Sequence, residues 1–417
     1  MKVLVLGCGK IGSVVAWDLA NRPEVETVGI MDVNREALQE TKNWIDCHKV
    51  VTHELDIVSQ PEKGSQLLQG YDVGVITLPS RRASYKAIEA AIEAGTDMVD
   101  ILEEYHRRPD KHEIEGLEIQ PSELDVYGED LHNRAMARNI TILDGMGLEP
   151  GLTNITVGAG IRMLDQADTV AVRVGGIPAR EAADRHPMKY VITWAFRHVL
   201  REYMVKVQVL ENGRVVEVDA STGRESFRFT KLGRDDELEA AITPGMPSFI
   251  YTRTGLRNFV AKTIRWPGHW QSVETLKECG LLDLSPVEIM NEDAGTVQIS
   301  PRDFVSRVLE PKLHPLDGDT DLSVMWNTVT GSVNGRKARI EYHMWDQADV
   351  KRGISSMART TGFTAAASAM LLAKKEIHPK GIVPPEDAIV GDAYKSLMCD
   401  LRNRGIEIVE SPIEYLN

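Results

Sequence analysis

The chain has 417 residues, of which 42% are hydrophobic, so it is long enough to form two domains with apolar cores. Its 48 basic and 62 acidic residues give a formal net charge of −14, which argues against nucleic acid and membranes as partners. The four cysteines are scattered and form no C-x-x-C pair. The sequence therefore indicates no zinc site and no disulfide framework, and it favours a reducing cytoplasm.

The chain begins with a strand, a glycine-rich turn and a helix. Residues 2–6 (KVLVL) predict a strand, and Gly7, Gly9 and Gly12 follow it in the spacing G-x-G-x-x-G. A helix is expected over residues 13–22, and residues 25–32 predict a second strand. This order is typical of a dinucleotide-binding unit, in which the turn admits the pyrophosphate and the helix N-terminus binds its phosphates. The alternative interpretation is a tight turn without a ligand.

The end of the second strand bears on the choice of cofactor. Asp32 lies where a carboxylate can accept hydrogen bonds from the ribose hydroxyls, and its charge repels a 2′-phosphate. Arg35 can pair with such a phosphate. We therefore expect NAD as the cofactor, with NADP as the alternative, and we also expect contacts from Lys10, Ile11 and Val33.

Strands and helices continue to alternate up to residue 147. Further strands are predicted at 48–57, 72–79, 96–101 and 141–145, with helices at 81–95 and 131–140, the first of these ending at Gly95 as its C-cap. The pattern predicts a Rossmann-type α/β domain with a doubly wound parallel sheet, whose ligands bind at the carboxyl ends of the strands. These ends supply further candidate cofactor contacts, which are Asp56, Ile57, Thr77, Leu78, Pro79, Asp100, Ile101, Met146 and Gly147.

Residues 103–125 are charged and contain two prolines. One interpretation is a solvated surface insertion. The other is a lid over the cofactor site that includes His106, Arg107 and Arg108.

After Gly147 the pattern changes to β-strands joined by turns. Strands are expected at 170–178, 203–220 and 226–232, and residues 323–346 predict a hairpin with Asn334-Gly335 at its turn. Helices at 362–377 and 393–405 and a strand at 406–410 follow. We predict a dinucleotide-binding domain over residues 1–147 and a second mixed, largely antiparallel α+β domain over 148–354.

Five segments outside the glycine turn share a resemblance. They are GMGLEPGLTN (145–154), PMKYVITWAFRHVLREY (187–203), TIRWPGHWQSVETLKECGL (263–281), ARTTGFTAAASAMLLAKKEI (358–377) and KGIVPPED (380–387). Together they resemble the saccharopine dehydrogenase-like family, which includes lysine 6-dehydrogenases, saccharopine reductases and carboxynorspermidine dehydrogenases. The resemblance implies a two-domain enzyme, often a homodimer, in which residues 355–417 fold back onto the first domain. It also implies a nicotinamide in the interdomain cleft and hydride transfer at a C–N bond.

Two residues are candidates for proton transfer. His269 ends the unusual segment RWPGH, and a histidine titrates near neutral pH. The alternative is a structural histidine held by hydrogen bonds. Glu149 follows the sixth strand at the expected cleft mouth, where it can hold a substrate ammonium group or accept its proton.

The expected substrate carries a carboxylate, which calls for cationic or helix-terminal groups. Arg197 and Arg201 share one face of a predicted helix and can bind a carboxylate together, although a surface ion pair is the alternative for Arg201. The remaining substrate-binding candidates are Arg265, Asn154, Arg359 and Thr360, of which the last three can equally be helix caps.

Three functions are compatible with these residues. The first is NAD(P)-linked oxidation of an amino-acid amine, as in a lysine 6-dehydrogenase. The second is reductive condensation of an aldehyde with an amine, as in a saccharopine or carboxynorspermidine dehydrogenase. The third is a sensor that binds the dinucleotide without turnover. The partner in each enzyme is a small amino acid or polyamine, and no metal is needed.

Overall fold

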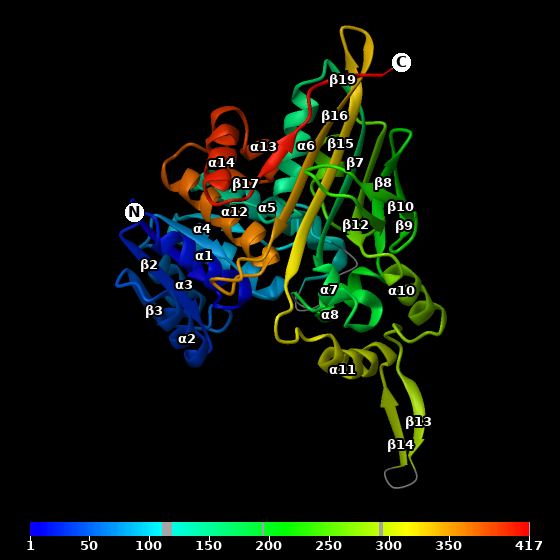
Figure 1. The fold of residues 1–417 in the computed structure, drawn as a ribbon. Helices are drawn as coiled ribbons and strands as arrows, with labels where there is room; N and C mark the ends of the chain where they lie inside the picture. The colour runs from blue at the N-terminus through cyan, green and yellow to red at the C-terminus, as the bar shows by residue number, and fades with distance from the viewer. Residues whose placement is uncertain (111–118, 194–195, 292–294, 417) are drawn as a thin grey trace.

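The computed structural model describes residues 1–110, 119–193, 196–291 and 295–416. Two sheets lie side by side, the first built mainly from the N-terminal third and the second from the middle of the chain (Figure 1). The first is parallel, and the second is mixed and largely antiparallel. The predicted fold class, a Rossmann sheet plus a mixed α+β domain, is therefore confirmed.

The first sheet has the strand order β17-β6-β5-β4-β1-β2-β3. Its strands are β1 (Lys2–Leu6), β2 (Thr27–Asp32), β3 (Val50–Glu54), β4 (Val73–Ile76), β5 (Asp97–Asp100), β6 (Thr141–Leu143) and β17 (Gly381–Val383). Because β1 lies between β2 and β4, the strand order reverses beside it. Ligands of doubly wound sheets bind at such a switch point, so the fold places the cofactor site above the end of β1.

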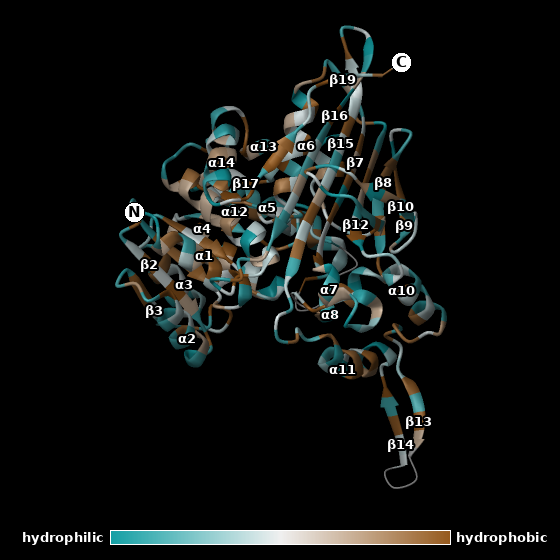
Figure 2. Ribbon diagram, in the orientation of Figure 1, coloured by the Kyte–Doolittle hydropathy of each residue, from teal (hydrophilic) through white to brown (hydrophobic). Residues whose placement is uncertain are grey.

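Among the described residues, five helices connect strands of the first sheet. They are α1 (Lys10–Ala20), α2 (Arg35–Ile45), α3 (Pro61–Leu68), α4 (Arg81–Ala94) and α5 (Leu124–Ala137), the last preceded by a short 3₁₀ turn at Pro121–Glu123. Helix α4 begins at Ser80, whose side chain accepts a hydrogen bond from the Ala83 amide, and it ends at Gly95 in the left-handed region, as predicted. In Figure 2 the buried α1 is mostly brown and the outer α2 mostly teal, the pattern of helices that cover a core.

The second sheet has the order β10-β11-β12-β7-β15-β16-β18, with β8, β9 and β19 paired beside it. Its strands are β7 (Gln166–Pro178), β8 (Lys206–Glu211), β9 (Arg214–Asp219), β10 (Glu225–Phe229), β11 (Asp236–Ile242), β12 (Asn258–Arg265), β15 (Asp321–Val333), β16 (Arg336–Gln347), β18 (Ile408–Glu410) and β19 (Glu414–Tyr415). The predicted hairpin turn at Asn334-Gly335 is confirmed, since both residues have positive φ angles, 51° and 74°.

Helix α12 (Ser356–Ala373) lies between the two sheets and packs on α1, β4, β5 and β15. It is rich in alanine, glycine, serine and threonine, so neighbouring elements approach it closely. A Cβ atom on Gly362 would lie 3.2 Å from a side-chain carbon of Val14 in α1. Helix α12 therefore contacts both sheets and fills part of the space between them.

The remaining helices surround the second sheet or follow α12. They are α6 (Leu152–Arg162), α7 (Arg180–Ala183), α8 (Phe196–Glu202), α9 (Phe249–Thr252), α10 (His269–Glu278), α11 (Pro301–Leu313), α13 (Pro385–Ala388) and α14 (Gly391–Asn403), with a 3₁₀ turn at Pro187–Lys189. A hairpin of β13 (Val287–Asn291) and β14 (Gly295–Ile299) projects from the body (Figure 1). In the described part of the chain, every helix is too short or too polar to cross a membrane.

The C-terminal segment is divided between the two sheets. Strand β17 pairs with β6 of the first sheet, and α14 packs on α12. Strands β18 and β19, however, pair with β16 of the second sheet. The expectation that all of 355–417 packs on the first domain is therefore wrong for its last strands, which complete an exposed edge of the larger sheet.

Candidate active site between the two sheets

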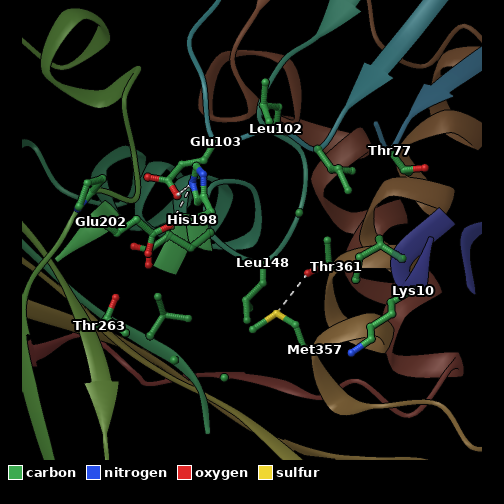
Figure 3. A pocket seen from close by; sticks show the side chains of 18 of the residues that line it. Lys10, Thr77, Leu102, Glu103, Leu148, His198, Glu202, Thr263, Met357 and Thr361 are labelled. Atoms are coloured by element: carbon green, nitrogen blue, oxygen red, sulfur yellow. Dashed lines mark hydrogen bonds and ion pairs between the residues drawn. The ribbon is translucent and has the colours of Figure 1, made fainter. Parts of the chain in front are cut away.

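A cavity of about 480 Å³ lies between the two sheets. One wall comes from the glycine turn, the ends of β4 and β5 and the start of α12, and the other comes from α8 and the strands of the second sheet. Figure 3 shows these walls facing each other, with Lys10, Thr77 and Thr361 on one side and His198, Glu202 and Thr263 on the other.

The glycine turn fits a dinucleotide pyrophosphate. Gly7 has a φ angle of 107°, and a Cβ atom on Gly12 would lie 2.0 Å from the Gly7 carbonyl oxygen, so both positions require glycine. A Cβ atom on Gly9 would meet nothing within 4 Å, because Gly9 faces open space at the start of α1. No side chain caps this helix start, so its amide groups are available to phosphate oxygens.

Asp32 lies beside the glycine turn at the end of β2. Its carboxylate accepts hydrogen bonds from the backbone amides of Cys8 (2.7 Å) and Asn34 (2.8 Å). These bonds orient the carboxylate toward the turn, where the adenosine ribose of a dinucleotide lies. Val33 next to it is 64% exposed.

The strand ends divide into residues that reach the cavity and residues that do not. Thr77, Leu78, Pro79, Ile101 and Gly147 line it, together with Gly9, Lys10 and Ile11. Four other predicted contacts do not. Ile57 and Met146 are buried in the core, Asp100 is buried in an ion cluster behind the wall, and Asp56 is bonded to the Val58 amide in its own loop. The prediction of direct cofactor contact is wrong for Ile57, Met146 and Asp100, because their side chains point into the domain.

The opposite wall carries a group of acidic side chains around a histidine. The side chain of His198 lies 3.2 Å from Glu202 and 4.0 Å from Glu103 (Figure 3). The carboxyl groups of Glu103 and Glu202 are hydrogen-bonded to each other, and burial together with the charge of Glu202 raises the pKa of Glu103 well above its usual range. Glu103 therefore keeps a proton to a higher pH than an exposed glutamate does.

Glu149 also faces this cavity, as expected for a cleft-mouth residue. Its Oε1 atom is buried and has no hydrogen-bond partner among the described residues. Burial and the charges of Glu103 and Glu202 raise the pKa of Glu149 well above its usual range. Glu103, Glu149 and Glu202 thus form one acidic group, which we call the carboxyl cluster, and such a group favours a cationic ligand.

Arg265 lines the same cavity and is almost fully buried. Its Nε and Nη2 atoms donate to the Tyr203 hydroxyl, and its Nη1 donates to the carbonyl groups of Gly176 and Ile264. The guanidinium is therefore held rigidly in the wall, where its charge interacts with that of Glu202.

His269 lies behind Tyr203 and outside the lining of the cavity. Its Nε2 atom is 3.0 Å from the Tyr203 hydroxyl, and its Nδ1 is 2.9 Å from the Met188 carbonyl oxygen. Burial, aided by the charge of Arg265, lowers the pKa of His269 to about 3, so the ring stays neutral. The structure therefore places His269 as a structural residue, the alternative that the sequence left open, rather than as a proton carrier.

The two arginines of α8 point to different places. Arg197 is at the surface, 68% exposed, in an ion pair with Asp303 of α11. Arg201 is less exposed and contacts Asp110 at 3.3 Å. It lines a second cavity of about 380 Å³, which adjoins the first one at Glu103. The prediction that both arginines bind one carboxylate is wrong, because Arg197 is paired with Asp303 at the surface, whereas Arg201 lines the second cavity.

Three other predicted substrate contacts are structural. Asn154 is fully buried and bonds to Glu386, Ser248 and the Gly151 amide. Arg359 is paired with Asp346. Thr360 is buried with its hydroxyl bonded to the Ser356 carbonyl oxygen. The cavity is lined instead by the next residue, Thr361.

Sequence reasoning missed six residues of the cavity lining. They are His198, Glu202, Glu103 and Thr263 around the carboxyl cluster, and Met357 and Thr361 of α12 on the opposite side. His198 and Glu202 are separated by one helical turn, a spacing that brings two side chains onto one face, and this signal was available. Glu103 belongs to the segment interpreted as surface or lid. The structure corrects the surface interpretation for residues 103–106, because Glu104 and His106 are buried. Residues 111–118 of the segment lie outside the described residues.

Comparison with known proteins agrees with this geometry. Residues 3–138 match the saccharopine dehydrogenase NADP binding domain, and residues 147–406 match the saccharopine dehydrogenase C-terminal domain. The chain is similar to an alpha-aminoadipic semialdehyde synthase of Arabidopsis thaliana (22% identity, 70% of this chain and 34% of that one). It is also similar to the mitochondrial protein of the same name from Mus musculus (22% identity, 92% of this chain and 45% of that one).

The chain thus spans less than half the length of these two relatives. Its fold matches that of the apo saccharopine dehydrogenase (L-Glu forming) from Saccharomyces cerevisiae, with a TM-score of 0.76, 18% identity and full coverage of both chains. These two domain models together cover most of the sequence, and the first of them describes an NADP binding domain. The chain belongs to the saccharopine dehydrogenase family of NAD(P)-dependent oxidoreductases.

Proposed function

We propose that the chain oxidises the C–N bond of an amino-acid amine with NAD(P), in the manner of a lysine 6-dehydrogenase. The observation that carries this proposal is the composition of the cavity. One wall is the glycine turn that fits a dinucleotide, and the facing wall is the carboxyl cluster with His198. A cationic amine is the ligand that such a wall favours, and it would lie next to the cofactor.

The carboxyl cluster suits the first step, which is loss of a proton from the substrate ammonium. An ammonium group has no lone pair, so the carbon beside it cannot release hydride until the nitrogen is neutral. A carboxylate with a raised pKa accepts this proton more readily than an ordinary one. We assign that role to Glu149, supported by the unpartnered Oε1 atom, with Glu103 and Glu202 holding the ammonium.

Hydride acceptance from the carbon next to the nitrogen is the chemistry that a bound nicotinamide would supply here. The residues of the chain orient the substrate for it. Arg265 offers a fixed positive charge to a substrate carboxylate, while Leu148, Val174 and Met357 exclude bulk water. The resulting imine is then hydrolysed by water to an aldehyde and ammonia.

A second function, condensation of an aldehyde with an amine, is favoured by the second cavity. This cavity adjoins the first at Glu103 and Pro244, and it carries Arg201 and Lys206. A product formed by joining two amino acids has a second carboxylate-bearing arm, and the second cavity offers space for it. In that case the enzyme works as a reductase and the same carboxyl cluster delivers a proton to the nitrogen.

One experiment separates these functions. Lysine with NAD(P) is compared with aldehyde–amine pairs and reduced cofactor, and the absorbance of the reduced nicotinamide is followed. Arg201→Ala should raise the KM of the condensing substrate and leave lysine oxidation unchanged if the second cavity binds an arm. Arg197→Ala, one turn away on the surface, is the matched control and should change neither rate. Tight NAD(H) binding without turnover of any amine would instead favour the sensor.

Two further expectations stay predictions. A homodimer is implied by the resemblance, and a cytoplasmic location is favoured by the scattered cysteines. Sedimentation of the purified protein and microscopy of a tagged chain test them.

A further inference from the structure

A buried ionic cluster joins the ends of β5 and β6, directly behind the cavity wall. The side chains of His106, Asp100 and Asp144 are each at most 1% exposed. His106 Nδ1 lies 2.6 Å from Asp144 Oδ1, and its backbone amide donates to Asp144 Oδ2 at 2.8 Å. Its Nε2 lies 2.9 Å from the Ser84 hydroxyl, which donates to Asp100. We call these four residues the histidine clamp.

The clamp fixes the loop that follows β5. Glu103 lies between Asp100 and His106 in this loop and is turned toward the cavity. The next residue, Glu104, is bonded at 2.6 and 2.9 Å to the guanidinium of Arg81 in α4, so the loop is anchored on both sides of Glu103. Such buried bidentate pairs restrict the position of the backbone between them.

The clamp also fixes the loop that follows β6. Asp144 is the first residue after that strand, and the chain then runs through Met146 to Glu149 in the cavity wall. The Met146 amide donates to the Asp100 carbonyl oxygen at 2.6 Å, which ties the two loops together at their bases. His106 therefore connects the loop that carries Glu103 to the loop that carries Glu149.

The two carboxyl groups of the histidine clamp need the positive charge of the His106 ring between them. Burial alone would lower the pKa of His106, but the carboxylates of Asp144 and Asp100, with a smaller contribution from Glu104, raise it to about 9. The groups that face the ring are Asp100 from the end of β5, Asp144 from the loop after β6, Glu104 from the loop after β5, and Ser84 with Tyr85 from α4. A positive ring between two buried carboxyl groups holds them together, and its removal would leave them to repel each other.

We propose that His106 is a positioning residue that holds the Glu103 loop against the Glu149 loop, so that both carboxyl groups can bind one substrate ammonium. The inference rests on the proposed function for its catalytic consequence, but the spacing of the two carboxyl groups is a property of the protein alone. His106 itself touches neither the cavity nor a reacting atom, so its effect passes through Glu103 and Glu149.

The test compares His106→Leu with Ser84→Ala, a smaller change in the same clamp. The control is His53→Leu in β3, at the far edge of the first sheet, where His53 bonds Tyr71 at 2.7 Å. For each variant the NADH dissociation constant, kcat, the pH dependence of kcat/KM and the thermal midpoint are measured. The pH titration of the carboxyl groups is followed by infrared spectroscopy with isotope-labelled glutamate.

If the clamp positions the pair, His106→Leu shifts the raised carboxyl titration toward the usual glutamate range. It also lowers kcat by about tenfold or more, while the NADH dissociation constant stays within about twofold. Ser84→Ala shifts the carboxyl titration and kcat in the same directions as His106→Leu, but by less. If His106→Leu does not fold, the result for Ser84→Ala tests the inference instead. His53→Leu changes neither.

Unchanged carboxyl titrations in both clamp variants overturn the inference. It is also overturned if activity, NADH affinity and thermal midpoint fall together, as they do for a merely destabilised fold. A shifted infrared titration in a protein that turns over no amine supports the clamp and rejects the proposed function, so the two failures are distinguishable.

Discussion

A Cβ atom on Gly245 would lie 2.6 Å from the Cδ atom of Glu149. The loop between β11 and α9 therefore packs closely on the carboxyl group of Glu149, to which we assign proton transfer. Glycine leaves the space that this carboxyl group occupies, so the shape of the cavity and the position of the proton acceptor depend on one missing side chain.

Gly245→Ala should reduce activity without unfolding the protein. The atoms that the new methyl group meets belong to the end of a flexible side chain, so Glu149 moves and the backbone does not have to. A displacement of about 1 Å at a reacting group can cost on the order of a hundredfold in rate. The measurements are kcat and the thermal midpoint. Gly255→Ala is the control, because its Cβ atom would meet nothing within 4 Å, and a similar loss there would contradict the assignment.

Gly9→Ala should weaken dinucleotide binding and leave stability unchanged. The φ angle of Gly9 is −74°, which alanine adopts, and its Cβ atom would point into open space at the start of α1. If the pyrophosphate lies there, the methyl group blocks its approach. We expect the Kd for NADH to rise by about tenfold or more, which equals about 1.4 kcal/mol, by calorimetry. An unaltered Kd would show that the pyrophosphate does not bind at this turn.

Asp32→Asn should move cofactor preference toward NADP. The substitution removes the charge that repels a 2′-phosphate and keeps one oxygen to accept the Cys8 or Asn34 amide. Arg35 can then pair with the 2′-phosphate of NADP without a repelling carboxylate beside it. The ratio of kcat/KM with NADP to that with NAD should rise by roughly tenfold, about 1.4 kcal/mol. A wild-type protein that already prefers NADP would show that Asp32 does not discriminate.

Glu149→Gln should raise stability at alkaline pH while it lowers activity. The pKa of Glu149 is raised in the folded protein above its ordinary value of 4.5. The folded state therefore binds this proton more tightly than the unfolded state, and stability falls as pH rises from about 4.5 toward the folded-state pKa. Glutamine is neutral at every pH and avoids this loss.

The thermal midpoints of Glu149→Gln and wild type should thus agree near pH 4 and diverge as the pH rises, with the variant higher. The exposed Glu62→Gln is the control and should show no such divergence. A variant that is equally destabilised at every pH would mean that Glu149 is ionised and paired in the folded state.

Much of the first domain could be predicted from sequence. Its strands, the glycine turn and the Gly95 cap were confirmed because each depends on residues within a few positions of one another. The same holds for the turn at Asn334-Gly335. Helices α2 and α3 were not predicted, since the strands around them gave the stronger signals.

The complete lining of the cavity could not be predicted in this way. Thr360 was chosen where Thr361 lines the cavity, because one residue rotates a helix by about 100° and the sequence does not say which face meets the other domain. Arg197 and His269 were chosen by residue type, yet one lies in a surface ion pair and the other behind Tyr203.

The sequence by itself determined the dinucleotide-binding unit and the fold class, because backbone angles, turn residues and the spacing of apolar side chains act over short distances along the chain. Only the tertiary structure decided the composition of the candidate active site. Glu103, Glu149 and the α8 residues His198 and Glu202 are far apart in sequence, and they meet because the two sheets pack around α12. The raised pKa values of Glu103 and Glu149 come from burial at that junction and from the charge of Glu202, which no local pattern encodes.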